Sequence, residues 1–123
     1  MKLSKSEEQL MEYLWSSKKA FLKDLIELFP DPKPATTTIA TLLKRMSDKG
    51  FVDYKLYGNS REYYPTIKKS DYFTKQVNGI IKNYFENSPL NFASFFTKAT
   101  NLSEEELEEL KKIVDAEIQK KKK

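Results

Sequence analysis

The hydrophobic period of this 123-residue chain changes at Gly50, and the change restricts the folds open to its first half. Before Gly50, apolar residues recur every three or four positions, as they do in amphipathic helices. After it, residues 51–56 and 61–67 alternate between apolar and polar side chains, as strands do. Gly58-Asn59 between them is a hairpin-turn sequence. The sequence therefore predicts helices followed by a β-hairpin.

Three helical segments precede this hairpin. The first, residues 3–17, opens with Ser4 and Glu7 at the spacing of a capping box. The second, residues 20–29, ends at a run of prolines, and the third, residues 33–50, ends at a glycine. Three short helices and a hairpin are the element order of a winged helix-turn-helix, with the hairpin as the wing. A plain structural ribbon is the alternative for the hairpin.

The third segment has an outer face of unusual composition. One side of its helix is apolar, whereas the other carries threonines and basic residues. Threonine is a poor helix former, but its hydroxyl can bond phosphates or base edges and its methyl can touch thymine. An ordinary amphipathic helix is the alternative. The residues expected to bind DNA are Thr37, Thr38, Thr41, Lys44 and Arg45 on this helix and Lys55 and Arg61 on the hairpin.

The composition excludes several classes of function. Cysteine and histidine are absent, and no nucleophile–base pair or phosphate-cradling glycine loop is present. We therefore expect no enzyme activity, no metal site and no cofactor. No apolar run approaches the roughly 20 residues of a membrane span, and the start of the chain lacks the apolar core of a signal peptide. These features predict a cytoplasmic protein without membrane insertion.

Charge divides the chain into two parts. Residues 1–69 contain 13 basic and 9 acidic side chains, whereas residues 70–123 contain 9 of each. The excess positive charge thus belongs to the part with the threonine-rich helix, as a DNA partner requires. We expect a winged-helix DNA-binding domain over residues 1–69 and a helical dimerisation domain over residues 70–123.

The second part is predicted to contain three helices. The last one has the best-defined start, because Ser103 and Glu106 form a second capping box. A region this small cannot bury its aromatic and aliphatic surface alone, so we expect a second copy of the chain to cover it. The alternative is that these helices fold back on the winged helix in a monomer. The residues expected at the dimer interface are Phe73, Val77, Ile80, Ile81, Tyr84, Phe85, Leu107, Leu110, Ile113 and Val114.

Several short motifs occur in a fixed order along nearly the whole chain. They are Leu3-Ser4 with Glu7, then Met11, Leu14 and Trp15, then Thr38-Ile39, Thr41-Leu42, Arg45-Met46 and Lys49-Gly50-Phe51, then Tyr63 with Pro65, and finally Leu102-Ser103, Glu106-Leu107 and Leu110. Together they resemble the penicillinase-repressor family of bacterial winged-helix regulators, which includes β-lactamase, methicillin-resistance and copper-responsive repressors. The resemblance implies a mainly α-helical dimer that binds an inverted-repeat operator and represses transcription.

The resemblance also implies roles for single residues. Thr38, Thr41 and Arg45 match family positions in or beside the DNA-reading helix. Copper-responsive members use cysteine pairs, which this chain lacks. In β-lactam-responsive members a membrane metalloprotease sensor signals cleavage within the fifth helix, and the corresponding bond joins Phe95 and Phe96, where the best-known members have an Asn-Phe pair.

The function predicted from the sequence is that of a homodimeric DNA-binding repressor, relieved by a signal such as proteolysis in the C-terminal region. Its partners would be operator DNA, a second copy of the chain and a membrane metalloprotease sensor. The alternative is a winged-helix protein-interaction module that does not read DNA.

Overall fold

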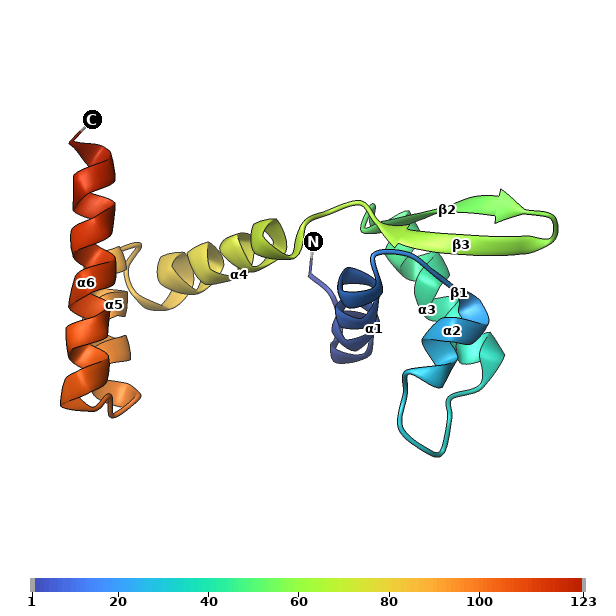
Figure 1. Cartoon of the computed structure of the whole chain (residues 1–123), viewed down its shortest axis with the longest axis horizontal. Helices are drawn as coiled ribbons and strands as arrows, with labels where there is room; N and C mark the ends of the chain where they lie inside the picture. Colours follow the sequence, from blue (N-terminus) through green and yellow to red (C-terminus); the bar gives the residue numbers. More distant parts are fainter. Residues whose placement is uncertain (1, 123) are drawn as a thin grey trace. The chain divides into compact units, whose positions relative to one another are not determined.

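A computed structural model of the chain describes residues 2–122 (Figure 1). The chain forms two compact units, one up to Thr74 and one from Lys75 onward. Helix α4, Lys69–Tyr84, runs across this division. The predicted boundary between residues 69 and 70 falls at the start of that helix and remains a prediction.

The first unit contains three helices and a small sheet. The helices are α1 (Lys5–Ser17), α2 (Leu22–Glu27) and α3 (Thr36–Asp48), and the strands are β1 (Ala20–Phe21), β2 (Val52–Tyr57) and β3 (Ser60–Pro65). The strands are antiparallel in the order β1-β3-β2. Figure 1 shows β2 and β3 as a hairpin that extends beyond the helices. The predicted fold class, mainly helical with a small hairpin, is confirmed.

The predicted helix over residues 20–29 is confirmed only for Leu22–Glu27, because the helix ends two residues early and its first two predicted residues form a strand. Ala20 and Phe21 form β1, in which Ala20 lies opposite Tyr63 and Phe21 opposite Glu62. Their apolar spacing continues that of α2, so the local pattern favours a helix. The backbone groups of Ala20 and Phe21 instead satisfy the free edge of β3, which only the folded chain brings near.

The core of the first unit collects the apolar faces of all three helices. Each helix places one stripe inside, and the hairpin closes the core with Val52 and Tyr63. Trp15 at the end of α1 donates from its indole nitrogen to the Ile67 carbonyl at 2.9 Å, which fixes the chain between β3 and α4. The largest fully buried side chains are Tyr72, Leu10, Met11, Leu14, Leu25, Ile39, Leu43 and Met46.

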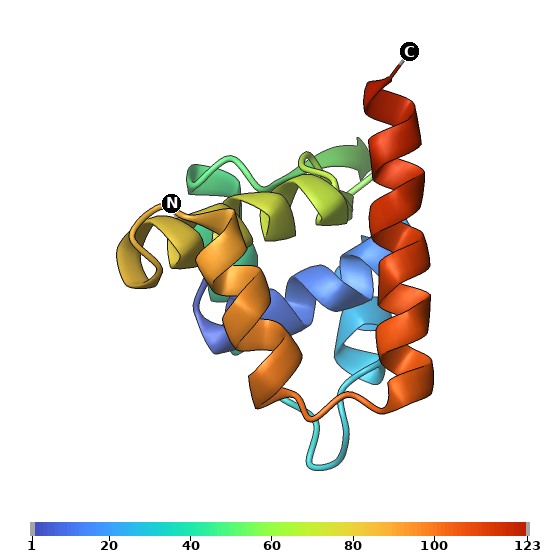
Figure 2. The same cartoon turned by 90° about the vertical axis from the view of Figure 1, so that its left-hand side faces the viewer.

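The second unit contains the rest of α4, α5 (Pro89–Ala99) and α6 (Glu104–Lys121). Figure 2 shows that α5 and α6 are joined at one end by a short loop. The Ser88 side chain caps α5, and Ser103 and Glu106 form the predicted capping box of α6. Phe85 packs against Phe92, with ring centroids 5.4 Å apart, so the second unit has a small aromatic centre.

Candidate nucleic-acid interface

Helix α3 has one buried side and one exposed side. Ile39, Leu43 and Met46 are buried in the core. All five helix residues predicted to bind DNA are exposed, and they are Thr37, Thr38, Thr41, Lys44 and Arg45. Because the buried stripe fixes the helix about its axis, the threonine and basic face points to solvent as a unit.

The threonine hydroxyls are not all equally available. The Thr41 hydroxyl donates to the Thr37 carbonyl within α3 at 2.8 Å. This local bond is common for threonine inside a helix. It leaves the Thr41 methyl group and an oxygen lone pair for a ligand, while the hydroxyls of Thr37 and Thr38 remain exposed donors.

Lys44 faces an acidic neighbour that sequence reasoning missed. Its ammonium lies 3.5 Å from the Asp48 carboxylate, and both side chains are more than 60% exposed. Asp48 is four residues after Lys44 and eleven after Thr37. Residues at these spacings lie on one side of a helix, so Asp48 is on the same face as the threonines. Asp48 therefore puts a negative charge on a surface otherwise suited to phosphate.

The two basic residues predicted on the hairpin lie on opposite faces of it. In the register of β2 and β3, Lys55 lies opposite Glu62 and Leu56 lies opposite Arg61. Side chains alternate along a strand, so Arg61 shares its face with the core residue Tyr63, and Lys55 points the other way. Of the two, only Arg61 is brought beside α3.

A groove runs between α3 and this face of the hairpin. It is lined by residues of α3 together with two tyrosines and one arginine, namely Ala40, Thr41, Leu43, Lys44, Ser47, Asp48, Tyr54, Arg61 and Tyr63. The Arg61 guanidinium carbon lies 4.4 Å from the centre of the Tyr54 ring. Contact with Tyr63, and then with Tyr54, raises the pKa of the Arg61 guanidinium further above neutrality, so this side chain is always charged.

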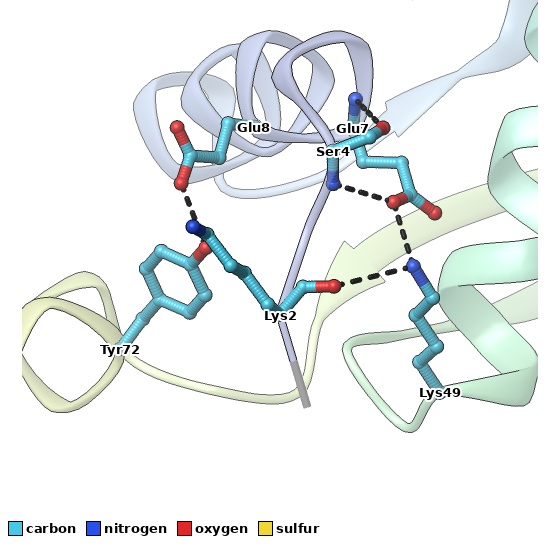
Figure 3. Close-up of polar contacts among 6 residues, drawn as sticks. All are labelled: Lys2, Ser4, Glu7, Glu8, Lys49 and Tyr72. Atoms are coloured by element: carbon cyan, nitrogen blue, oxygen red, sulfur yellow. Dashed lines mark hydrogen bonds and ion pairs between the residues drawn. The ribbon is translucent and has the colours of Figure 1, made fainter. Parts of the chain in front are cut away.

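An ion pair at the end of α3 ties this helix to α1 (Figure 3). Lys49, the residue after α3, places its ammonium 2.7 Å from Glu7 Oε1, which also accepts from the Ser4 backbone nitrogen at 2.8 Å. Burial raises the pKa of Glu7, but the hydrogen bonds from Lys49 and Ser4 outweigh burial and lower it below its ordinary value. One carboxylate thus caps α1 and anchors the end of α3.

Most residues predicted at a dimer interface are exposed. On α6, Leu107, Val114 and Ile118 form an exposed stripe at spacings of seven and four. Ile81 is buried, whereas Leu110 and Phe85 are half-buried. The remaining predicted positions are exposed, and they are Phe73, Val77, Ile80, Tyr84 and Ile113.

Phe95 and Phe96, the residues matched to a cleavage position, lie within α5. Both side chains are exposed, Phe95 more so than Phe96. Among residues 2–122, no cluster of three or more acidic, cysteine or histidine side chains is arranged to hold a metal ion. Over the same residues, no helix combines the length and apolar character needed to cross a membrane.

Three helices, an antiparallel hairpin and an exposed threonine-rich third helix define this chain as a winged-helix protein. A family model described as "Penicillinase repressor" matches residues 3–116. The chain belongs to the penicillinase repressor family, as the sequence motifs indicated.

Three known proteins illustrate the relationship. The methicillin resistance regulatory protein MecI of Staphylococcus aureus strain N315 is 32% identical over 118 residues, which cover 92% of this chain and 93% of MecI. The penicillinase repressor of Bacillus licheniformis is 26% identical over 121 residues, covering 98% of this chain and 94% of that protein. The solution structure of the DNA binding domain of the repressor BlaI is 29% identical, with a TM-score of 0.51, covering 58% of this chain and 88% of that domain.

Proposed function

We propose that this chain is a DNA-binding transcriptional repressor whose reading element is α3. One observation carries the proposal: the exposed face of α3 joins threonines to Lys44 and Arg45 on a winged-helix scaffold. The names of the relatives agree, because they describe a penicillinase repressor and the DNA-binding domain of a repressor. Short hydroxylated side chains allow close approach to a DNA groove, and the basic residues suit its phosphates.

We further propose that the repressor binds as a homodimer to an inverted-repeat operator. The exposed stripe of Leu107, Val114 and Ile118 supports this proposal, because an apolar stripe of this kind needs a covering surface. A twofold dimer would present two copies of α3 to two half-sites. The proposal includes no enzymatic role, and it places the protein in the cytoplasm with the DNA that it binds.

The release signal proposed from the family resemblance is cleavage near Phe95 and Phe96, prompted by a membrane metalloprotease sensor. The exposure of both side chains on α5 is compatible with it. Cleavage there would separate α6 from the rest of the chain and so remove the exposed stripe from the DNA-binding unit. Incubation of the protein with cells that carry the sensor, followed by mass spectrometry of the fragments, tests this step.

DNA binding is tested by footprinting the purified protein on the DNA upstream of its own gene and then measuring affinity at several salt concentrations. With about three to five phosphate contacts from each protomer, the logarithm of the binding constant should fall with the logarithm of salt at a slope of about −5 to −9. Lys44→Ala removes one contact from each protomer of the dimer, so it should reduce that slope by about two. A salt-independent affinity would contradict the proposal.

Sequence reading is tested separately from phosphate binding. Joint replacement of Thr37, Thr38 and Thr41 by alanine should remove the preference for the footprinted site over scrambled DNA, because the groove-facing hydroxyls and methyls are lost. Alanine is a good helix former, so α3 should persist. If the triple variant keeps its preference for the site, α3 does not read DNA, and the protein-interaction module becomes the better explanation.

A further inference from the structure

Arg61 is stacked on an aromatic ring before any ligand arrives. Its guanidinium carbon lies 4.4 Å from the centre of the Tyr54 ring. Tyr54 is itself half-buried and packs against the buried Tyr63, with ring centroids 5.7 Å apart. The exposed Arg61 side chain therefore packs on an aromatic ring that is itself held in place by a core residue.

The strand register explains why the two side chains meet. Tyr54 lies opposite Tyr63 and Leu56 lies opposite Arg61, so Tyr54 and Arg61 are diagonal neighbours on one face of the hairpin. Long and aromatic side chains reach each other across such diagonals. This face borders the groove beside α3, where Lys44 supplies a second positive charge.

Apart from the N–H group that contacts the Tyr63 hydroxyl, stacking leaves the hydrogen-bond donors of Arg61 available to a ligand. A guanidinium on a ring face is attracted to the ring, while its N–H groups still point outward within their own plane. None of the ion pairs formed among residues 2–122 involves Arg61. A planar fork of donors with no carboxylate partner suits a phosphate, which guanidinium can bind through two parallel hydrogen bonds.

We propose that Tyr54 is a positioning residue that holds Arg61 in the groove between α3 and the hairpin, where Arg61 and Lys44 bind the phosphate backbone of DNA. The inference rests on the proposed DNA-binding function and adds a specific role for the Tyr54 ring. An unrestrained arginine loses side-chain freedom when it binds, and the ring reduces that loss by ordering Arg61 beforehand.

The test combines DNA affinity with a mutant cycle. Arg61→Ala should weaken binding and, because both protomers lose a contact, reduce the salt slope by about two. Tyr54→Leu should weaken binding about two- to fivefold in the wild-type background, and have no further effect once Arg61 is alanine. Tyr54→Phe keeps the ring and should bind as tightly as wild type. Tyr57→Leu is the matched control, because Tyr57 lies on the same strand but on the opposite face.

A second measurement does not require DNA. In the NMR spectrum of the full chain, the Arg61 side-chain protons should be shifted upfield by the ring current of Tyr54. The shift should persist in Tyr54→Phe and disappear in Tyr54→Leu. The wild-type spectrum tests the inference even if Tyr54→Leu fails to fold. Random-coil chemical shifts for the Arg61 side-chain protons in the wild-type protein would overturn the inference.

The outcomes separate the inference from the proposed function. If wild-type protein does not bind DNA, both are overturned. If wild type binds DNA and Tyr54→Leu weakens binding as much without Arg61 as with it, the ring acts through the fold, and only the inference is overturned. Unchanged affinity in Tyr54→Leu or in Arg61→Ala would overturn it as well.

Discussion

Asp48 is the residue whose charge fits the proposed DNA-binding surface of α3 least well. Its carboxylate lies 3.5 Å from the Lys44 ammonium on the exposed face of α3. A phosphate that binds Lys44 has to compete with the Asp48 carboxylate for the ammonium group. The negative charge of Asp48 also repels the phosphate. The pair itself is exposed and contributes little to folding.

Asp48→Asn should therefore raise DNA affinity, by about two- to tenfold at low salt, through loss of like-charge repulsion. The gain should shrink as salt screens the charge. Fluorescence anisotropy with operator DNA measures the effect. Asp115→Asn changes net charge by the same amount on a different helix, α6, so an equal gain in that variant would show that only net charge matters.

Glu7 is a residue whose importance comes from burial. Its side chain is 3% exposed, that of Lys49 is 28% exposed, and Glu7 Oε2 has no hydrogen-bond partner among the described residues. Glu7→Gln removes the charge that Lys49 needs while keeping the shape. We expect a loss of about 2–3 kcal/mol in the free energy of unfolding at pH 7. Denaturant titration followed by circular dichroism measures it.

The pH dependence of this pair follows from the lowered pKa of Glu7. The Glu7–Lys49 ion pair stabilises the fold at pH values above 4.5, the ordinary pKa of glutamate. This stabilisation is lost as the pH falls through the lower pKa that Glu7 has in the folded state. The difference between wild type and Glu7→Gln should therefore shrink in acid. Glu12→Gln is the control, because the Glu12–Lys69 pair at 3.0 Å is about half exposed and should be worth about 1 kcal/mol or less.

At the scale of elements, the start of α4 is fastened to α1 by Tyr72. Its hydroxyl donates to Glu8 Oε2 at 2.7 Å, and its ring is buried beside Trp15 (Figure 3 shows the hydrogen bond). Burial and, after it, the bond to Glu8 raise the pKa of Tyr72 to about 12 from an ordinary value of 10.0. The folded protein thus favours the protonated phenol.

Tyr72→Phe should lower the free energy of unfolding near pH 7 by about 1–2 kcal/mol, through loss of a hydrogen bond to a charged group. The sign of the pH effect follows from the raised pKa: wild type should lose stability as pH rises above 10, while the Tyr72→Phe variant should lose less. Denaturation at several alkaline pH values tests this. Tyr84→Phe alters an exposed tyrosine, and a similar change in its pH profile would contradict the assignment.

Residues that can test dimerisation must be exposed in the folded chain, so that a substitution affects assembly and not folding. Ile81 is buried, so a charge there would disturb folding itself. Leu107 and Val114 on α6 are exposed and can accept a charge without unfolding the chain. They are the better positions for separating assembly from folding.

Val114→Glu should convert a dimer to a monomer, because a glutamate would be buried without a partner at the interface. Operator binding should weaken at least tenfold, since a monomer engages one half-site. Sedimentation velocity and DNA titration measure the two effects. Glu108→Gln, a change at an exposed α6 position, should alter neither, and a dimeric Val114→Glu protein would exclude this surface.

Features that depend on residues close together in the chain follow from local sequence alone. The capping boxes at Ser4 and Ser103, the hairpin after Gly50 and the exposed side of α3 follow from spacings within a few residues, and the structure has them all. Helix periodicity is a local property, so the exposure of Thr37, Thr41 and Lys44 could be predicted.

Contacts between segments far apart in the chain are visible only in the folded protein. Lys49 meets Glu7 across 42 positions of sequence, Ala20 and Phe21 leave the helical pattern to pair with β3, and Tyr54 receives Arg61 rather than Lys55. These pairings depend on packing, on strand register and on which edge of a strand is free. These contacts cannot be predicted from residue spacing in the sequence, because the partners become neighbours only after folding.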